Sequence, residues 1–355
     1  MASGTPARRS SSPSARRCGG RRDPRVDADG PAPPPRGSFA VFLARRLVSG
    51  ALLLAVVTAA TFVLISLAPG NTAQVLAGQA GADPEYLALI SERLQLDRPL
   101  PYQVGSYLRA AAQADFGFSV IQGRPVRDAI FARLPASLLL AAAAVLLAAI
   151  LGITFGVLAA ARRGGVVDAA ISVSSLIAYS LPVFWLGQLL IALFAVRLHW
   201  LPAGGMRSAD EPGGIIDVVR HLVLPASTFS LLLAALIVRV TRIATAEALA
   251  EDYVSAARAK GASERRVLLH HALPNALRPV VTVLTGYLGI VLTGAVLVET
   301  VFVWPGLGRL LYDSVLSRDT PMLAGLLLFS AGLIVIANLF ADVLYRVLDP
   351  RTRFQ

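Results

Sequence analysis

The sequence predicts an all-α polytopic membrane protein with about six transmembrane helices. Three observations support this fold class: 55% of the 355 residues are hydrophobic while only 15% are charged, the mean hydropathy is +0.64, and the apolar residues gather in runs long enough to cross a bilayer. Soluble domains carry about 25% charged residues. A lipid bilayer is therefore the expected solvent for most of the chain.

The predicted spans alternate with short polar connections. A transmembrane helix needs about 20 apolar residues. The third predicted span is longer than this and contains Pro182, so a tilted or Pro-kinked single helix is favoured, with two half-helices as the alternative. The six spans are placed at residues 47–67, 135–160, 166–196, 222–241, 280–298 and 322–347.

The arginines indicate the orientation. The chain has 33 Lys and Arg against 22 Asp and Glu, and its arginines follow the ends of the second, fourth and sixth spans. Cytoplasmic loops of membrane proteins are enriched in Lys and Arg, so both termini are expected in the cytoplasm. This clustering, without a base-reading motif, argues against nucleic-acid binding. The single cysteine, Cys18, excludes a disulfide within the chain.

Composition divides the chain into five parts. The first is rich in Ser, Pro, Gly and Arg and too poor in apolar residues to offset the entropy of ordering. The parts are a disordered basic cytoplasmic tail (1–38), the first transmembrane helix (39–68), an extracytoplasmic loop domain (69–134), a core of five transmembrane helices with a cytoplasmic loop at 243–276 (135–347), and a cytoplasmic C-terminus (348–355).

The loop between the fourth and fifth spans is the most informative segment. Its acids precede its bases, as the helix dipole favours. Gly261 is expected to end a first helix, because glycine reverses the chain without a Cβ penalty. Ser263 and Glu264 can open a second helix that Pro274 stops. The small side chains of the first helix suit close approach of a partner protein, while an amphipathic helix lying on anionic lipid is the alternative.

This loop resembles the EAA loop of ABC import permeases, which reads Glu-Ala-Ala, three residues, Gly, nine residues, Ile, one residue, Leu-Pro. Ser255 replaces the Glu and His271 replaces the Ile. The sequence of residues 252–261 resembles that of the dipeptide and oligopeptide branch of this family. The residues that match in spacing are Ser255, Ala256, Ala257, Gly261, Leu273 and Pro274.

Further segments resemble the same family in the same order, and the resemblance runs from about Phe39 to the C-terminus. They are residues 115–119 with 125–126, 133–137, 180–187, 200–205, 299–309, 318–319, Asp342 and 349–351. The resemblance implies a type I ABC importer permease fold, with residues 135–347 as the ABC permease core.

The resemblance also implies a division of labour. Two homologous permeases pair, each sends its loop helix into one of two cytoplasmic ATPases, and an extracytoplasmic binding protein delivers peptide. Lys260 is the only lysine and precedes Gly261, so the chain lacks a Gly-Lys-Ser/Thr phosphate loop. We expect no enzyme activity or cofactor in this chain, with ATP and Mg²⁺ on the partner ATPases, and a multi-pass position in the bacterial inner membrane.

The loop and the spans supply candidate site residues. Those for ATPase coupling are Tyr253, Ser255, Ala256, Ala257, Arg258, Lys260, Gly261, Ser263, Arg266, Leu273 and Pro274. Tyr179, Pro182, Trp185 and Glu299 are candidates for the translocation path or gate, and Trp304 and Gly306 for the binding-protein contact. The alternatives are a passive kink at Pro182, a helix cap at Glu299 and a membrane-interface anchor at Trp304.

Five other polar positions have simpler interpretations. His270 and His271 point about a quarter-turn apart on a helix, so no metal site is expected. Arg239 and Arg242 are expected to extend to the inner headgroups. Asp342 is expected at a solvated interface, or facing the partner permease.

Other functions remain as alternatives. Permeases for nickel, glutathione and some sugars share the pattern, so peptide is the majority interpretation. A secondary transporter driven by an ion gradient should show ionisable residues at mid-span or inverted repeats, and few such residues are found. An intramembrane enzyme would need a nucleophile with a base at matching depth, and residues 172–180 have no such partner in view.

Overall fold

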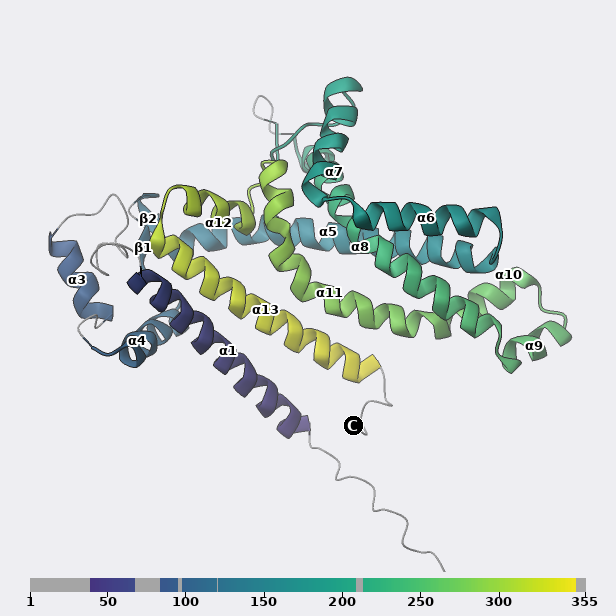
Figure 1. Cartoon of the computed structure of the whole chain (residues 1–355), viewed down its shortest axis with the longest axis horizontal. Coiled ribbons are helices and arrows are strands. Elements are labelled where there is room, and N and C mark those ends of the chain that lie inside the picture. The colour runs from purple at the N-terminus through teal and green to yellow at the C-terminus, as the bar shows by residue number, and fades with distance from the viewer. Residues whose placement is uncertain (1–38, 68–83, 95–97, 120, 209–212, 349–355) are drawn as a thin grey trace, which may run out of the picture.

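The computed structural model describes residues 39–67, 84–94, 98–119, 121–208 and 213–348. Most of these residues are helical, as predicted, and the long helices lie lengthwise beside one another (Figure 1). The predicted tail at 1–38 and the C-terminus at 349–355 lie outside the described residues. The orientation of the termini therefore stays a prediction.

The elements follow one another in a simple order. The first half contains α1 (Phe39–Leu67), α3 (Pro84–Leu94), α4 (Leu100–Ala112), β1 (Phe118–Ser119), β2 (Arg124–Pro125), α5 (Val126–Ala161), α6 (Val166–Ser180), α7 (Val183–Leu190) and the π-helix η1 (Ile191–Arg197). The second half contains α8 (Ile215–Leu249), α9 (Asp252–Ala259), α10 (Glu264–Arg266), the π-helix η2 (Val267–Ala272), α11 (Leu273–Val301), α12 (Leu307–Leu316) and α13 (Thr320–Leu348). The antiparallel pair β1–β2 is the only sheet in the described part of the chain.

The described residues contain four helices long and apolar enough to span a membrane, α1, α5, α8 and α13, and a fifth span if the bent pair of α6 with α7–η1 counts as one. The predicted span at 280–298 falls within the 29-residue helix α11. The side chains of 288–294 lie outside the described residues. The structure thus confirms a polytopic helical membrane protein, while the count of six stays a prediction.

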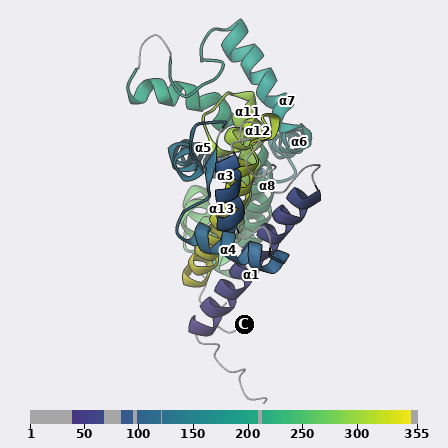
Figure 2. The ribbon, with the colours of Figure 1, turned by 90° about the vertical axis from the view of Figure 1, so that its left-hand side faces the viewer.

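The two ends of the helical bundle carry different connections. The short elements α3, α4, β1 and β2 lie at one end, which faces the viewer in Figure 2, and α9 and α10 lie at the opposite end (Figure 1). The segments predicted to face opposite sides of the membrane are therefore far apart.

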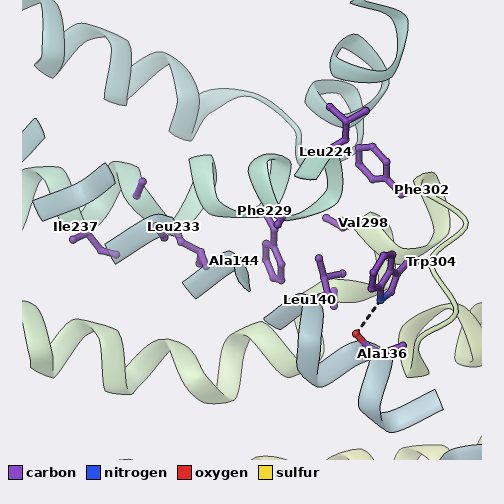
Figure 3. Packing of buried hydrophobic residues seen from close by; sticks show 14 of the residues in the cluster. Ala136, Leu140, Ala144, Leu224, Phe229, Leu233, Ile237, Val298, Phe302 and Trp304 are labelled. Carbon is purple, nitrogen blue, oxygen red and sulfur yellow. Dashed lines mark hydrogen bonds between the residues drawn. The ribbon is translucent and has the colours of Figure 1, made fainter. Parts of the chain in front are cut away.

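The centre of the fold is the close contact of α5 with α8. On α5, Ala144 and Ala148 are fully buried, and Gly152 and Gly156 continue the same stripe of small residues at four-residue spacing. A Cβ on Gly156 would lie only 2.8 Å from the Val238 carbonyl oxygen. Small residues at this spacing let two membrane helices approach until their backbones touch. Larger side chains from α8 and α11 fill the rest of the cluster (Figure 3).

One predicted boundary is corrected. Helix α5 begins at Val126, so residues 126–134, assigned to the extracytoplasmic loop domain, belong to the helix. Val126 and Ile130 are fully buried in a second apolar cluster with residues of α12 and α13. This packing lengthens the helix beyond its apolar run. Pro135 is accommodated inside it, as proline often is in membrane helices.

The third predicted span is not a single helix. Helices α6 and α7–η1 meet at an angle of 106°, so the two-helix alternative is the correct one. Pro182 has no N–H and its ring obstructs a helical turn, and Leu181 is extended, with φ −79° and ψ 134°, as a residue before proline prefers. Gly187 of α7 lies against Phe302, which fixes the new direction.

A buried polar cluster joins α5, α11 and α12. Glu299 is fully buried, and it accepts hydrogen bonds from the Ser137 hydroxyl at 2.6 Å and the Arg309 backbone N–H at 3.0 Å. The Leu307 N–H donates to the Ser137 hydroxyl oxygen at 2.8 Å. Together these groups satisfy amides that the first turn of α12 leaves unpaired.

We predict that Gly156→Leu lowers the apparent melting temperature in detergent by several degrees. The added side chain must separate α5 from α8, and such overpacking costs about 1–3 kcal/mol. Size-exclusion chromatography after heating measures the change. The control is Ala142→Leu, at an exposed position on the same helix, which should melt like the wild type. Equal melting of the two variants would contradict the close packing of α5 against α8.

We also predict that Glu299→Ala is more destabilising than Glu299→Gln. The alanine leaves a buried hydroxyl and a buried amide without an acceptor, at about 1–3 kcal/mol each, whereas glutamine retains one acceptor oxygen. Melting temperatures in detergent should rank wild type above the glutamine variant and that above the alanine variant. An alanine variant as stable as the wild type would show that the cluster does not hold α12.

Candidate functional site

The predicted helix, turn and helix are present between α8 and α11. Helix α9 carries Asp252 in its first turn and Arg258 in its last, the charge order that the helix dipole favours. Gly261 then has φ +82°, in the region that glycine adopts without a Cβ clash. The Gly261 N–H donates to the Arg258 carbonyl at 2.9 Å, and the Ala262 N–H to the Ala257 carbonyl at 3.2 Å. We call residues 252–266 the α9–α10 hairpin.

The hairpin has its own small core. Val254, Ala257 and Val267 are buried together, with Leu249 and Ala262 packed against them. The Ala257 side chain therefore packs mainly against its own chain, and its role in ATPase coupling stays a prediction. The neighbouring Ala256 is exposed. The stripe of small residues is therefore divided between the hairpin's core and its surface.

An ion pair braces the turn. Arg258 donates from Nε and Nη2 to the two carboxylate oxygens of Glu264, at 2.9 and 3.1 Å. This bidentate bond from the guanidinium holds the pKa of the Glu264 carboxyl below its ordinary value. Both side chains are largely exposed, so the pair contributes little to global stability. Its effect is local, since it links the two helices across Gly261.

The expectation that Pro274 stops the second helix is wrong. Helix α10 continues through the π-helical turn η2 into α11, and Pro274 occupies the first turn of α11. The residues before it, Ala272 and Leu273, are already helical, so Pro274 lies within a continuous helical path at the point where the π-helical turn η2 changes to α-helix. Asn275, next in sequence, donates to the Tyr253 hydroxyl at 3.1 Å. This contact ties the start of α11 back to α9.

The other predicted coupling residues lie mostly at the surface. Exposed residues are Tyr253, Ser255, Ala256, Arg258, Lys260, Gly261, Ser263, Arg266 and Pro274, and Leu273 is half-buried. They form a surface of small and basic groups at one end of the molecule. Such a surface can enter a groove of a partner protein, with the charges setting its register.

A pocket of about 520 Å³ lies between α6 and α8. Tyr179, a candidate for the translocation path, lines it together with Arg239 and Arg242. The two other path candidates on this segment, Pro182 and Trp185, are exposed beyond the bend and do not line it.

An ion pair at the edge of this pocket was missed by the sequence analysis. Arg242 donates to Asp168 from Nε at 2.5 Å and from Nη2 at 2.8 Å, and the Gly164 N–H donates to the same carboxylate at 2.9 Å. This corrects the expectation that Arg242 extends to the headgroups. The pair is 74 residues apart, so no local pattern reveals it. The sequence signal for this pair is Asp168, an acid that follows the Gly164–Gly165 turn and lies in the first turn of α6.

The structure does not place Trp304 and Gly306 where a soluble partner would reach them. Trp304 is fully buried and donates from its indole N–H to the Ala136 carbonyl at 2.9 Å (Figure 3). Gly306 is also buried, directly against the Glu299 carboxylate. Both residues serve the fold, because the indole needs a buried acceptor and the carboxylate leaves no room for a Cβ. Neither the binding-protein contact nor the membrane-interface anchor fits Trp304.

The remaining candidate positions are bonded within the fold or lack the neighbouring ligands that a metal site needs. Glu299 is bonded in the cluster described above, as the helix-cap alternative anticipated. Asp342 accepts a 2.8 Å bond from Arg46, so α13 pairs with α1 at this point. Among the described residues, no group of three or more His, Cys, Asp or Glu side chains is placed to hold a metal ion.

Comparison with known families gives two matches that together cover most of the chain. Residues 152–354 match the binding-protein-dependent transport system inner membrane component, and residues 39–141 match the N-terminal part of such membrane components. The first match alone spans more than half of the chain and contains the α9–α10 hairpin.

Individual relatives agree with this assignment. The chain is 41% identical over 334 residues to a di/tripeptide transport system permease protein of Pseudomonas aeruginosa (strain UCBPP-PA14), covering 88% of this chain and 99% of the relative. It is 39% identical over 315 residues to a glutathione transport system permease protein of Escherichia coli (strain K12), with the same coverage.

A solved structure supports the fold. The structure of the MetNI methionine ABC transporter in inward-facing conformations aligns with a TM-score of 0.51 and 19% identity, covering 62% of this chain and 95% of that chain. The chain therefore belongs to the family of inner membrane components of binding-protein-dependent transport systems, the permease subunits of ABC importers.

Proposed function

We propose that this chain forms half of the translocation pathway of an ATP-driven importer for dipeptides and oligopeptides in the bacterial inner membrane. A second homologous permease completes the pathway, two cytoplasmic ATPases bind and hydrolyse ATP with Mg²⁺, and an extracytoplasmic binding protein delivers the peptide. In this proposal the chain carries no cofactor and performs no hydrolysis. Its relatives transport dipeptides, tripeptides or glutathione according to their names.

The observation that carries the proposal is the exposed and braced α9–α10 hairpin. Only Ala250 and Glu251 separate α8 from α9, and on the other side the helical path runs through η2 into α11 without a loop. A displacement of the hairpin is therefore a displacement of both long helices. This connection suits a contact that transmits movement of an ATPase into the membrane.

Glutathione is a second candidate substrate, since one relative is a glutathione permease. Glutathione is itself a tripeptide, so both candidates require a path for a small solute with free carboxylates. Nickel as the substrate and an ion gradient as the energy source are two further alternatives, which the uptake experiment distinguishes. The described residues do not bring together three metal-ligating side chains.

We predict that Ala256→Trp abolishes co-purification of the ATPases and ATP-dependent uptake of a labelled dipeptide. The bulky side chain would block a close docking surface while leaving the hairpin's core of Val254 and Ala257 intact. Uptake is measured in vesicles that contain the whole importer. The control is Ala250→Trp, an exposed position outside α9, which should retain both properties.

Three results would contradict this proposal. ATPases that still co-purify with the Ala256→Trp variant would exclude docking at this surface. Uptake abolished by a protonophore but not by ATP depletion would indicate a secondary transporter. Competition by Ni²⁺ or glutathione, but not by unlabelled dipeptides, would reassign the substrate within the family.

The ion pair of Arg258 and Glu264 predicts a pH dependence of the hairpin. The folded pKa of Glu264 is depressed, so the pair stabilises the turn fully above the unfolded pKa of about 4.3 and loses this effect as pH falls through the folded pKa. Hydrogen-exchange protection factors at Gly261 and Ala262 should fall in that acidic range. Glu264→Gln should show the reduced protection at every pH. Protection in this variant equal to wild type at neutral pH would exclude a bracing role.

A further inference from the structure

The pocket between α6 and α8 has the size and lining of a binding site. Its volume of about 520 Å³ lies within the range of about 300–1,000 Å³ that small-molecule sites occupy. Its walls combine apolar side chains with hydroxyl and guanidinium groups. The lining residues from α6 are Ser172, Ser175, Leu176 and Tyr179, and those from α8 include Leu236, Arg239, Arg242 and Ile243.

The charge of this lining is unbalanced. It contains two arginines and no carboxylate. Arg242 is neutralised by Asp168 from outside the lining. Arg239 is exposed and makes no hydrogen bond or ion pair with any other residue in the described ranges. An ionisable side chain within a membrane helix is costly and usually has a partner or a functional role.

Arg239 is also separated from the packing that holds α8. Its neighbours Ile237 and Val238 are buried toward α5, and Thr241 lies in the same contact. The lining of the pocket includes no residue of α5. The guanidinium is therefore free to serve a group that enters from the open side of α6 and α8.

We propose that Arg239 binds the carboxylate of the transported peptide and thereby contributes to substrate selection. This inference rests on the proposed function and adds a substrate contact to it. A guanidinium forms paired hydrogen bonds with a carboxylate, and Arg242 makes this bond with Asp168 at the edge of the same pocket. The Tyr179 hydroxyl, which has no hydrogen-bond partner among the described residues, offers a second polar contact.

The phosphate of an anionic lipid headgroup shares this chemistry, and the lining favours the peptide. The neighbouring and more apolar groove of about 310 Å³ adjoins this pocket, shares Ser175, Ala235 and Val238 with it, and extends away from Arg239 to α5. The pocket of Arg239 instead mixes hydroxyl groups with apolar walls, as suits a short peptide with a charged end.

The test compares a dipeptide with its C-terminal amide, which lacks the carboxylate. Vesicles containing the whole importer carry wild type, Arg239→Gln, Arg239→Lys or the control Arg278→Gln, an exposed arginine near the start of α11 and outside the pocket. For each variant the ratio of acid uptake to amide uptake is measured. The binding protein's own preference is the same in every variant, so it cancels when the ratios are compared.

We expect Arg239→Gln to lower the acid-to-amide ratio by about tenfold, as the loss of a charged hydrogen bond implies. Arg239→Lys should restore part of it, and Arg278→Gln should match the wild type. ATP hydrolysis without peptide should stay unchanged in Arg278→Gln. An unchanged ratio in Arg239→Gln, in an importer that transports peptides, would overturn the proposal.

Binding of a lipid headgroup by Arg239 would give a different experimental result. The same measurements are made in vesicles of phosphatidylcholine alone and of phosphatidylcholine with phosphatidylglycerol. If wild-type uptake of acid and amide falls equally without the anionic lipid, and Arg239→Gln removes this lipid dependence, the guanidinium serves a headgroup and the proposal is wrong. A wild-type importer that takes up neither peptide would instead disprove the proposed function, and this inference with it.

Discussion

The close contact of α5 and α8 is the constraint on which the rest of the structure depends. It exists because small residues recur every four positions on α5, so that the backbones meet where Gly152 and Gly156 lie. Membrane helices gain little from burying apolar surface away from lipid, and close packing is what holds them together. Helices α6 and α11 attach to this pair, and their positions follow from it.

Buried polar groups fasten the two ends of this packed centre. At one end the Glu299 carboxylate receives N–H and O–H groups from α12 and α5, and at the other Asp168 receives Arg242. Glu299 accepts hydrogen bonds from a hydroxyl and a backbone N–H, whereas Asp168 accepts two hydrogen bonds from the guanidinium of Arg242. The bonds to Glu299 order the segment after α11, and the ion pair holds α6 against α8, where the pocket forms.

Helix α8 joins the proposed substrate contact to the proposed ATPase contact. Arg239 lies on its pocket side, Arg242 forms an ion pair with α6 one turn later, and only two residues separate the end of α8 from α9. A rigid helix that carries all three features can convert a displacement at the hairpin into a change in the shape of the pocket. This coupling needs no contact beyond those of α8 itself.

The sequence by itself determined the class of protein, the positions of most apolar helices and the helix, turn and helix of the hairpin, because hydropathy, helical period and the demand for glycine at Gly261 are local properties. Only the tertiary structure decided the break at Pro182, the burial of Trp304 and Ala257, the continuation of the helix through Pro274 and the pairing of Asp168 with Arg242. These features depend on which surfaces meet across long stretches of chain. A sequence pattern records what a residue can do, whereas its neighbours in space determine whether a side chain is buried, paired or free.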